Sequence, residues 1–255
     1  MSIFTAHVGG ACDPAFELVA DLLSANIKTG AEVGASLYVN VGGEEVLDIW
    51  GGWHDRDHTA HWHEHTITNV FSSTKTVTSI ATLMLVEQGL LDLNEMVVHY
   101  WPEFGGAGRE RIRVRHLLSH TAGLPGWDPP ISWDEALDVD AATARLIAQA
   151  PWWEPGTNGS YHASTFGHLV SELFRRVAGR TLADFIAAEV AAPLAADFVL
   201  GVGDDDFDRV APVYPAHRRP AKPNAQDDAS VAQRTRRGNL SSMAGDEFAA
   251  FNSPA

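Results

Sequence analysis

Hydrophobic and polar residues in the first fifth of the chain follow patterns that predict one helix and one hairpin. Over Pro14–Ser24 the apolar residues recur at helical spacing, which predicts an amphipathic helix. Hydrophobic and polar residues then alternate in Ala35–Val41 and again in Glu44–Trp50, with Gly42-Gly43 between the two runs. Two alternating runs joined by two glycines are typical of a β-hairpin.

A helical period dominates the middle of the chain. Apolar spacing predicts a buried helix over Thr76–Gln88 that ends at Gly89, and an amphipathic helix over Ser164–Ala178. The other expected segments are helices at Arg115–Ser119, at Asp134–Ala150 and from a capping Thr181 to about Ala191, a connector at Leu90–Tyr100, and a Pro-, Asp- and Arg-rich loop at Gly203–Asn239.

Composition narrows the class of protein. The 255 residues carry a formal net charge of −15, and so acidic a surface repels phosphate backbones, which excludes a nucleic-acid partner. With Cys12 as the only cysteine, no intrachain disulfide forms. The N-terminus lacks the pattern of a secretory signal, and no apolar run is long enough to span a bilayer. We therefore expect a cytoplasmic protein with no membrane partner.

Candidate chemistry begins at Ser72 and Lys75, three residues apart just before the predicted helix. A serine hydroxyl becomes a nucleophile when a base takes its proton, and a lysine on the same helix face is such a base if burial lowers its pKa. One alternative is an N-cap serine followed by a surface lysine. Another is a dyad of Ser73 with Lys75, although residues two apart do not share a helix face.

Two further segments extend this pattern. Ile112–Pro125 contains the string RHLLSHTAGLP, and Pro155–Gly167 reads PGTNGSYHASTFG. Together with Ser-x-x-Lys they resemble the serine β-lactamase-related superfamily, which holds class C β-lactamases, D,D-peptidases and the β-lactamase-like (family VIII) carboxylesterases. The resemblance runs from about Val33 to the C-terminus, and its Tyr-His-Ala-Ser-Thr variant looks most like the esterase branch.

The resemblance implies an α+β fold of the β-lactamase/transpeptidase type, with an antiparallel sheet flanked by helices and a helical subdomain. Residues 13–75 would give the helix, the hairpin and the approach to the catalytic helix. Residues 76–200 would be mainly helical, and 201–255 a long loop and an incomplete end. Members of the family continue well beyond this length and carry a third motif, Lys/His-x-Gly or Trp-Gly-Gly. Because no such motif follows Phe248–Phe251, we expect the N-terminal portion of one larger domain.

The resemblance also assigns catalytic roles. Ser72 would form an acyl-enzyme, and Lys75 would act as general base or proton relay. Tyr161 would be a second base, since a phenolate beside Lys75 can take the Ser72 proton and return it to the leaving alcohol. In the alternative interpretation Lys75 only holds Ser72 and Tyr161 by hydrogen bonds, and Tyr161 is a core residue.

Substrate contacts are expected from four residues. Tryptophans in segments that line the cleft in relatives would form an apolar wall, and they are Trp101, Trp127, Trp133, Trp152 and Trp153. We assign substrate binding to Trp127, Trp153, His162 and Ala163. Class C β-lactamases have asparagine at the position of Ala163, and alanine can neither donate nor accept a hydrogen bond there, which favours esters over amides.

Histidines are numerous but are assigned no chemistry. His116 and His120 are expected to fix the loop behind the site rather than to catalyse. A second group, consisting of His54, His58, His61, His63 and His65 among acidic residues, is expected to be a solvated loop without a metal.

The sequence therefore predicts a serine hydrolase that cleaves a small carboxylic ester without metal or cofactor. One alternative is a β-lactamase or D,D-peptidase acting on amides. The other is a non-catalytic protein that keeps the fold. The acyl group, the alcohol and the oligomeric state stay open.

Overall fold

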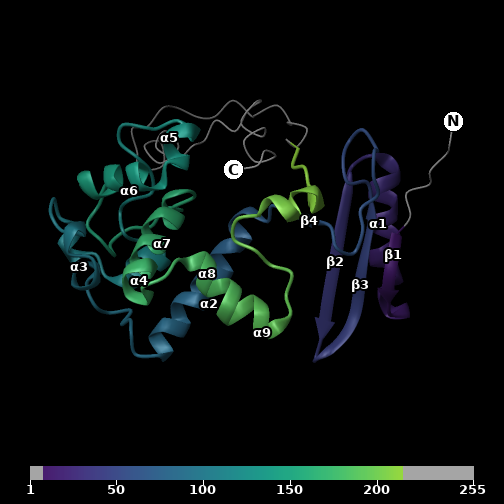
Figure 1. Ribbon diagram of the computed structural model, residues 1–255, viewed down its shortest axis with the longest axis horizontal. Coiled ribbons are helices and arrows are strands. Elements are labelled where there is room, and N and C mark those ends of the chain that lie inside the picture. Colours follow the sequence, from purple (N-terminus) through teal and green to yellow (C-terminus); the bar gives the residue numbers. More distant parts are fainter. Residues whose placement is uncertain (1–7, 215–255) are drawn as a thin grey trace. The chain divides into compact units, whose positions relative to one another are not determined.

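The chain divides into two units in the computed structural model, which describes residues 8–214 (Figure 1). One unit contains residues 8–69 and 202–214, and the other contains residues 70–201. Residues 202–214 therefore belong with the N-terminal unit.

A three-stranded antiparallel sheet lies in the first unit. Strands β2 (Gly34–Val41) and β3 (Glu44–Gly52) form the predicted hairpin, and β1 (Val8–Cys12) pairs with the other edge of β3. The sequence did not indicate β1, because its glycines give no alternating pattern. Gly10 has φ +104°, and a Cβ at this position would lie 2.1 Å from the carbonyl oxygen of Asp48, so only glycine fits.

The predicted first helix is α1 (Glu17–Thr29), which extends five residues beyond Ser24. A 3₁₀ turn precedes it, and Asp13 caps that turn by accepting a hydrogen bond from the backbone of Ala15 at 2.8 Å. Helix α1 lies against the sheet (Figure 1), and its buried side chains form a small core with those of β3, made of Leu23, Ile27, Leu47 and Ile49.

Residues 202–214 are more ordered than the predicted loop over Gly203–Asn239. They form a 3₁₀ helix at Asp204–Arg209 and a short strand β5 (Val210–Ala211), which pairs in parallel with β4 (Ile67–Thr68). The loop prediction is therefore wrong for this part, and residues 215–255 lie outside the described range.

The second unit is helical. Its helices are α2 (Thr74–Glu87), α3 (Val97–Tyr100), α4 (Val114–Leu118), α5 (Trp133–Leu137), α6 (Val139–Ala148), α7 (Thr165–Ala178), α8 (Leu182–Ile186) and α9 (Ala192–Leu194), with a π-helical turn at Ala187–Ala191. The core lies largely between α2, α4, α7 and α8, where the apolar stripe predicted for Ser164–Ala178 is buried. Thr181 caps α8 as predicted.

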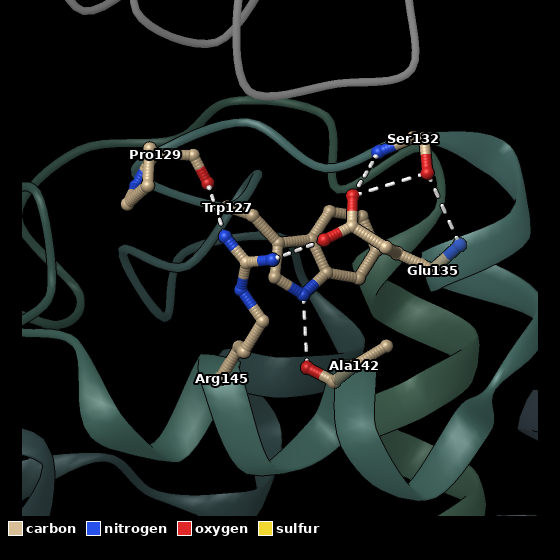
Figure 2. Close-up of polar contacts among 6 residues, drawn as sticks. All are labelled: Trp127, Pro129, Ser132, Glu135, Ala142 and Arg145. Atoms are coloured by element: carbon tan, nitrogen blue, oxygen red, sulfur yellow. Dashed lines mark hydrogen bonds and ion pairs between the residues drawn. The ribbon is translucent and has the colours of Figure 1, made fainter.

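The predicted helix over Asp134–Ala150 is two helices. Asp138 ends α5, and its carboxylate accepts a hydrogen bond from the backbone of Ala141 at 3.1 Å, which starts α6. Ser132 and Glu135 form a capping box at the start of α5 (Figure 2). The helix over this segment was predicted from its composition, which does not reveal such a break.

Helix α2 is buried on one side only. Its inward face contains Thr78, Ala81, Thr82 and Leu85, whereas Ile80 and Leu83 are about half exposed. The prediction of a buried helix therefore holds for one face.

Candidate active site

The turn before α2 places Ser72 and Lys75 together. Ser72 lies in a 3₁₀ turn at Phe71–Ser73 that leads directly into α2, and its side chain is exposed. The Nζ atom of Lys75 lies 3.3 Å from Ser72 Oγ. Phe71 has φ +46°, an uncommon conformation for a bulky residue and one that is enriched at functional sites. The predicted Ser-Lys pair is thus formed.

Lys75 is held by a second contact as well. Its half-buried Nζ donates a hydrogen bond to the carbonyl oxygen of Ala163 at 2.8 Å. It also lies 5.1 Å from the ring centre of Tyr161 and 5.6 Å from that of Phe166, within the range of cation–π attraction. The amine is therefore fixed between α2 and the segment that carries Tyr161.

Ser73, the competing nucleophile, is also exposed. Among the described residues no hydrogen bond joins its hydroxyl to Lys75, whereas Ser72 has one. The geometry favours Ser72 over Ser73 as the partner of Lys75.

Tyr161 lies beside this pair with 48 % of its surface exposed. Its ring, rather than its hydroxyl, contacts Lys75, and within residues 8–214 no hydrogen bond joins the phenol to Ser72 or Lys75. The structure brings the three predicted catalytic residues together, with the phenol hydroxyl bonded to neither Ser72 nor Lys75.

Two of the four predicted substrate-binding residues are buried. Trp127 is 1 % exposed, and its Nε1 donates to the carbonyl of Ala142 at 2.9 Å. Figure 2 shows this bond together with Arg145, which donates to the Glu135 carboxylate and to the carbonyl of Pro129. Trp127 is therefore part of the core and offers no surface to a substrate.

His162 is also 1 % exposed. Its Nδ1 lies 2.6 Å from the Ser160 carbonyl, and its Nε2 accepts a hydrogen bond from Leu124 N–H at 3.2 Å. These contacts correct the prediction that His162 touches substrate, because both ring nitrogens are already used in holding the loop together.

Trp153 and Ala163 are only partly buried. Trp153 donates through Nε1 to the carbonyl of Thr121 at 3.2 Å, so its indole is anchored, and Ala163 contributes its carbonyl to Lys75. Of the other tryptophans named above, Trp101 packs in the core against Phe104. Substrate binding stays a prediction for Trp153 and Ala163.

Residues 120–124 and 152–165 are joined by a series of hydrogen bonds. Trp152 N–H donates to Gly123 O at 2.7 Å, and the Thr165 hydroxyl donates to Leu124 O at 2.7 Å. Gly123 has φ +84°, and a Cβ there would lie 2.9 Å from the Trp153 carbonyl oxygen, so glycine is required for this approach. The HTAGLP string therefore supports the segment that carries Tyr161.

His116 has the structural role that the sequence predicts. Its Nδ1 accepts a hydrogen bond from the N–H of Arg113, the residue that caps α4. Burial, with a smaller effect from Arg115 and Arg113, lowers the pKa of His116 and favours the neutral ring that this bond needs.

The histidine-rich loop, residues 54–65, belongs to the first unit. His58 and His61 stack on Trp53 with ring centres 4.4 and 4.5 Å from it, an arrangement that the sequence did not indicate. In residues 8–214, no group of three or more His, Cys, Asp or Glu side chains is arranged to hold a metal ion. No helix in this range is both long and apolar enough to cross a membrane.

Burial makes His162 a source of acid sensitivity. Loss of hydration on burial lowers the pKa of His162 from 6.5 to about 4. Between these values the unfolded chain binds a proton that the folded chain does not, so stability is lost as the pH falls from 6.5 toward 4. We expect His162 to account for about 2–3 kcal/mol of the decrease in unfolding free energy between pH 7.5 and 4.5.

Urea unfolding of His162→Gln at the two pH values checks this, because glutamine does not titrate. The variant should lose less stability than the parent over the same interval. The control His65→Gln, at a largely exposed position, should keep the parent's dependence. Equal losses in all three proteins would contradict the assignment.

Comparison with known proteins identifies the family. The family model described as beta-lactamase matches residues 19–251. The chain belongs to the beta-lactamase family. It is 36 % identical over 191 residues to Esterase/beta-lactamase LipL of Mycobacterium tuberculosis, a match that covers 75 % of this chain and 44 % of LipL.

Solved structures agree with this assignment. A family VIII carboxylesterase is 39 % identical, with a TM-score of 0.77 and coverage of 82 % of this chain and 58 % of that one. A penicillin-binding protein homologue from Caulobacter crescentus is 34 % identical, with a TM-score of 0.79 and coverage of 87 % and 59 %. The predicted α+β fold of this beta-lactamase family member is confirmed, and the chain spans about half the length of the curated relatives it matches.

Proposed function

We propose that this chain carries the nucleophile of a serine hydrolase that cleaves carboxylic esters through an acyl-enzyme on Ser72. The observation that supports this most directly is the 3.3 Å distance between Lys75 Nζ and Ser72 Oγ, with Lys75 anchored on the Ala163 carbonyl. The likeness to a family VIII carboxylesterase and to LipL, which is named an esterase and β-lactamase, supports the reaction class.

The proposed chemistry begins with proton transfer from Ser72. Once it has released a proton, the Lys75 amine can still donate one hydrogen to Ala163 O while its lone pair accepts the Ser72 proton. Oγ then attacks the ester carbonyl carbon to form a tetrahedral adduct. When the adduct collapses, the C–O bond to the alcohol breaks, the alcohol takes a proton from Lys75 or Tyr161, and the acyl group stays on Ser72.

Hydrolysis of the acyl-enzyme completes the cycle. Water attacks the acyl carbon while Lys75 or Tyr161 accepts a proton from it. The carboxylic acid then leaves, and Ser72 regains its proton. The Ser72 N–H lies in the 3₁₀ turn that leads into α2, and in this proposal it supplies one donor to the oxyanion.

Covalent labelling tests this proposal. A fluorophosphonate should modify Ser72, and peptide mass spectrometry should locate the adduct there. An adduct on Ser73 would contradict the Ser72–Lys75 assignment. No adduct in the folded protein would support the non-catalytic alternative.

Esters are expected to be preferred to β-lactams. Ala163 offers no side-chain amide to a lactam substituent, and one missing hydrogen bond is worth about 1–2 kcal/mol, or about 10- to 30-fold in rate. We expect p-nitrophenyl acetate to exceed nitrocefin in kcat/KM by at least this factor. Ala163→Asn should narrow the ratio, and a parent enzyme equally active on both would count against the esterase.

Chelation should leave activity unchanged, because serine–lysine chemistry requires no Lewis acid. We expect equal p-nitrophenyl acetate hydrolysis with and without EDTA. A variant with alanine in place of His61, His63 and His65 should behave like the parent once circular dichroism confirms its fold. Activity lost on chelation and restored by zinc would overturn this prediction.

A further inference from the structure

His120 anchors the backbone on both sides of Tyr161. The N–H of Ser160, the residue before Tyr161, donates to the carbonyl oxygen of His120 at 3.2 Å. The N–H of His162, the residue after it, donates to His120 Nδ1 at 3.3 Å. A single residue on the HTAGLP segment thus accepts hydrogen bonds from the backbone N–H groups of both neighbours of the tyrosine.

The imidazole also packs on the tyrosine itself. The ring centres of His120 and Tyr161 are 4.8 Å apart, and the rings meet edge to face at 62°. This geometry is favourable for aromatic pairs. Because Tyr161 is half exposed and its phenol bonds neither Ser72 nor Lys75, this contact restricts a side chain that would otherwise sample several directions.

The tautomer of His120 follows from the hydrogen bond that its Nδ1 accepts from the His162 N–H. An Nδ1 that accepts from an N–H group carries no proton, so the neutral ring has its hydrogen on Nε2. Burial, followed by the nearby charge of Lys75, lowers the pKa of His120, which favours the neutral ring. The groups around the ring are Tyr161, His162, Phe166 and Lys75, and Lys75 is the one cation among them.

The backbone of His120 is adapted to this role. Its φ is +60°, a left-handed conformation that histidine and asparagine adopt more readily than most residues. This conformation directs the His120 carbonyl to Ser160 and the His120 ring to His162 and Tyr161. The uncommon backbone conformation of one residue therefore allows three contacts.

We propose that His120 is the positioning residue for Tyr161, holding the phenol ring against the Ser72–Lys75 pair so that it can exchange protons there. The inference rests on the proposed function, since it assigns a task to Tyr161 that only an acyl-transfer site requires. His120 itself does not touch the reacting atoms in this proposal.

His120→Asn tests the ring contact without removing the anchor. Asparagine tolerates the left-handed backbone, and its side-chain oxygen can accept the His162 hydrogen bond, but it lacks the aromatic edge. The measurement is the rate at which a fluorophosphonate phosphonylates Ser72, with loss of fluoride, in the parent, His120→Asn, Tyr161→Phe and the double variant. We expect His120→Asn to lower the maximal rate about 10- to 100-fold, with an unchanged half-saturating probe concentration.

The double variant separates positioning from a general structural effect. If His120 acts through Tyr161, adding His120→Asn to Tyr161→Phe causes little further loss. The same fold loss on both backgrounds would overturn the proposal, as would a His120→Asn protein as fast as the parent. His116→Asn, which changes the other histidine of the string, should label at the parent's rate.

Failure of the proposed function would look different. Tyr161→Phe would then label at the parent rate, or the parent would not label at all, and either result also removes the task assigned to His120. An activity-independent measurement is the pair of imidazole ¹⁵N shifts of His120, which should report protonated Nε2 and bare Nδ1. An Nδ1–H tautomer would overturn the anchoring geometry even in an active enzyme.

Discussion

Replacing Ser72 with alanine should eliminate fluorophosphonate labelling and lower ester hydrolysis about a thousandfold or more. The reason is that Oγ is the atom that would carry the acyl group, and within residues 8–214 no other hydroxyl is hydrogen-bonded to the Lys75 amine. Initial rates on p-nitrophenyl acetate, with mass spectrometry of the labelled protein, measure both effects.

Ser73→Ala is the matched control for this experiment. Ser73 is the next residue, is also exposed, and has no hydrogen bond to Lys75 among the described residues. We expect this variant to keep most of the parent's activity. If Ser73→Ala were the inactive protein and Ser72→Ala the active one, the nucleophile would be assigned to the wrong serine.

The parts of the site that the sequence predicted depend on short-range geometry. Ser72 and Lys75 are three residues apart at a helix start, and helical spacing alone brings such residues together. The hairpin was predicted for a similar reason, because Gly42-Gly43 joins two alternating runs. Neither prediction required knowledge of what packs on the segment.

Depth and long-range pairing were harder to predict. Tryptophan and histidine are found in cores and at surfaces, and only the folded structure shows that Trp127 and His162 are buried. The contact of His120 with Tyr161 joins residues about forty positions apart, which no local pattern encodes. Asp138 shows a third limit, because its carboxylate starts a new helix inside a segment whose composition predicts a single one.

The stability of the second unit is expected to depend on the buried side chain of Arg109. This side chain is 5 % exposed, and its guanidinium donates to three carbonyl oxygens. The bonds are Nε to Phe104 at 2.9 Å, Nη2 to Gly105 at 2.9 Å and Nη1 to Gln149 at 2.6 Å. These bonds join the turn that follows α3 to the end of α6. The segment that carries Tyr161 follows α6 directly in the chain.

Arg109→Met should therefore lower the free energy of unfolding by about 3–5 kcal/mol, because it leaves three carbonyls without a donor. In thermal melts this corresponds to a Tm about 6–15 °C lower. Arg109→Lys should recover only part of the loss, since an ammonium lacks the planar fork that reaches three acceptors. The control Arg111→Met removes an exposed ion pair with Glu154 and should cost less than about 1 kcal/mol. Equal melting temperatures for Arg109→Met and Arg111→Met would show that the buried guanidinium does not stabilise the second unit.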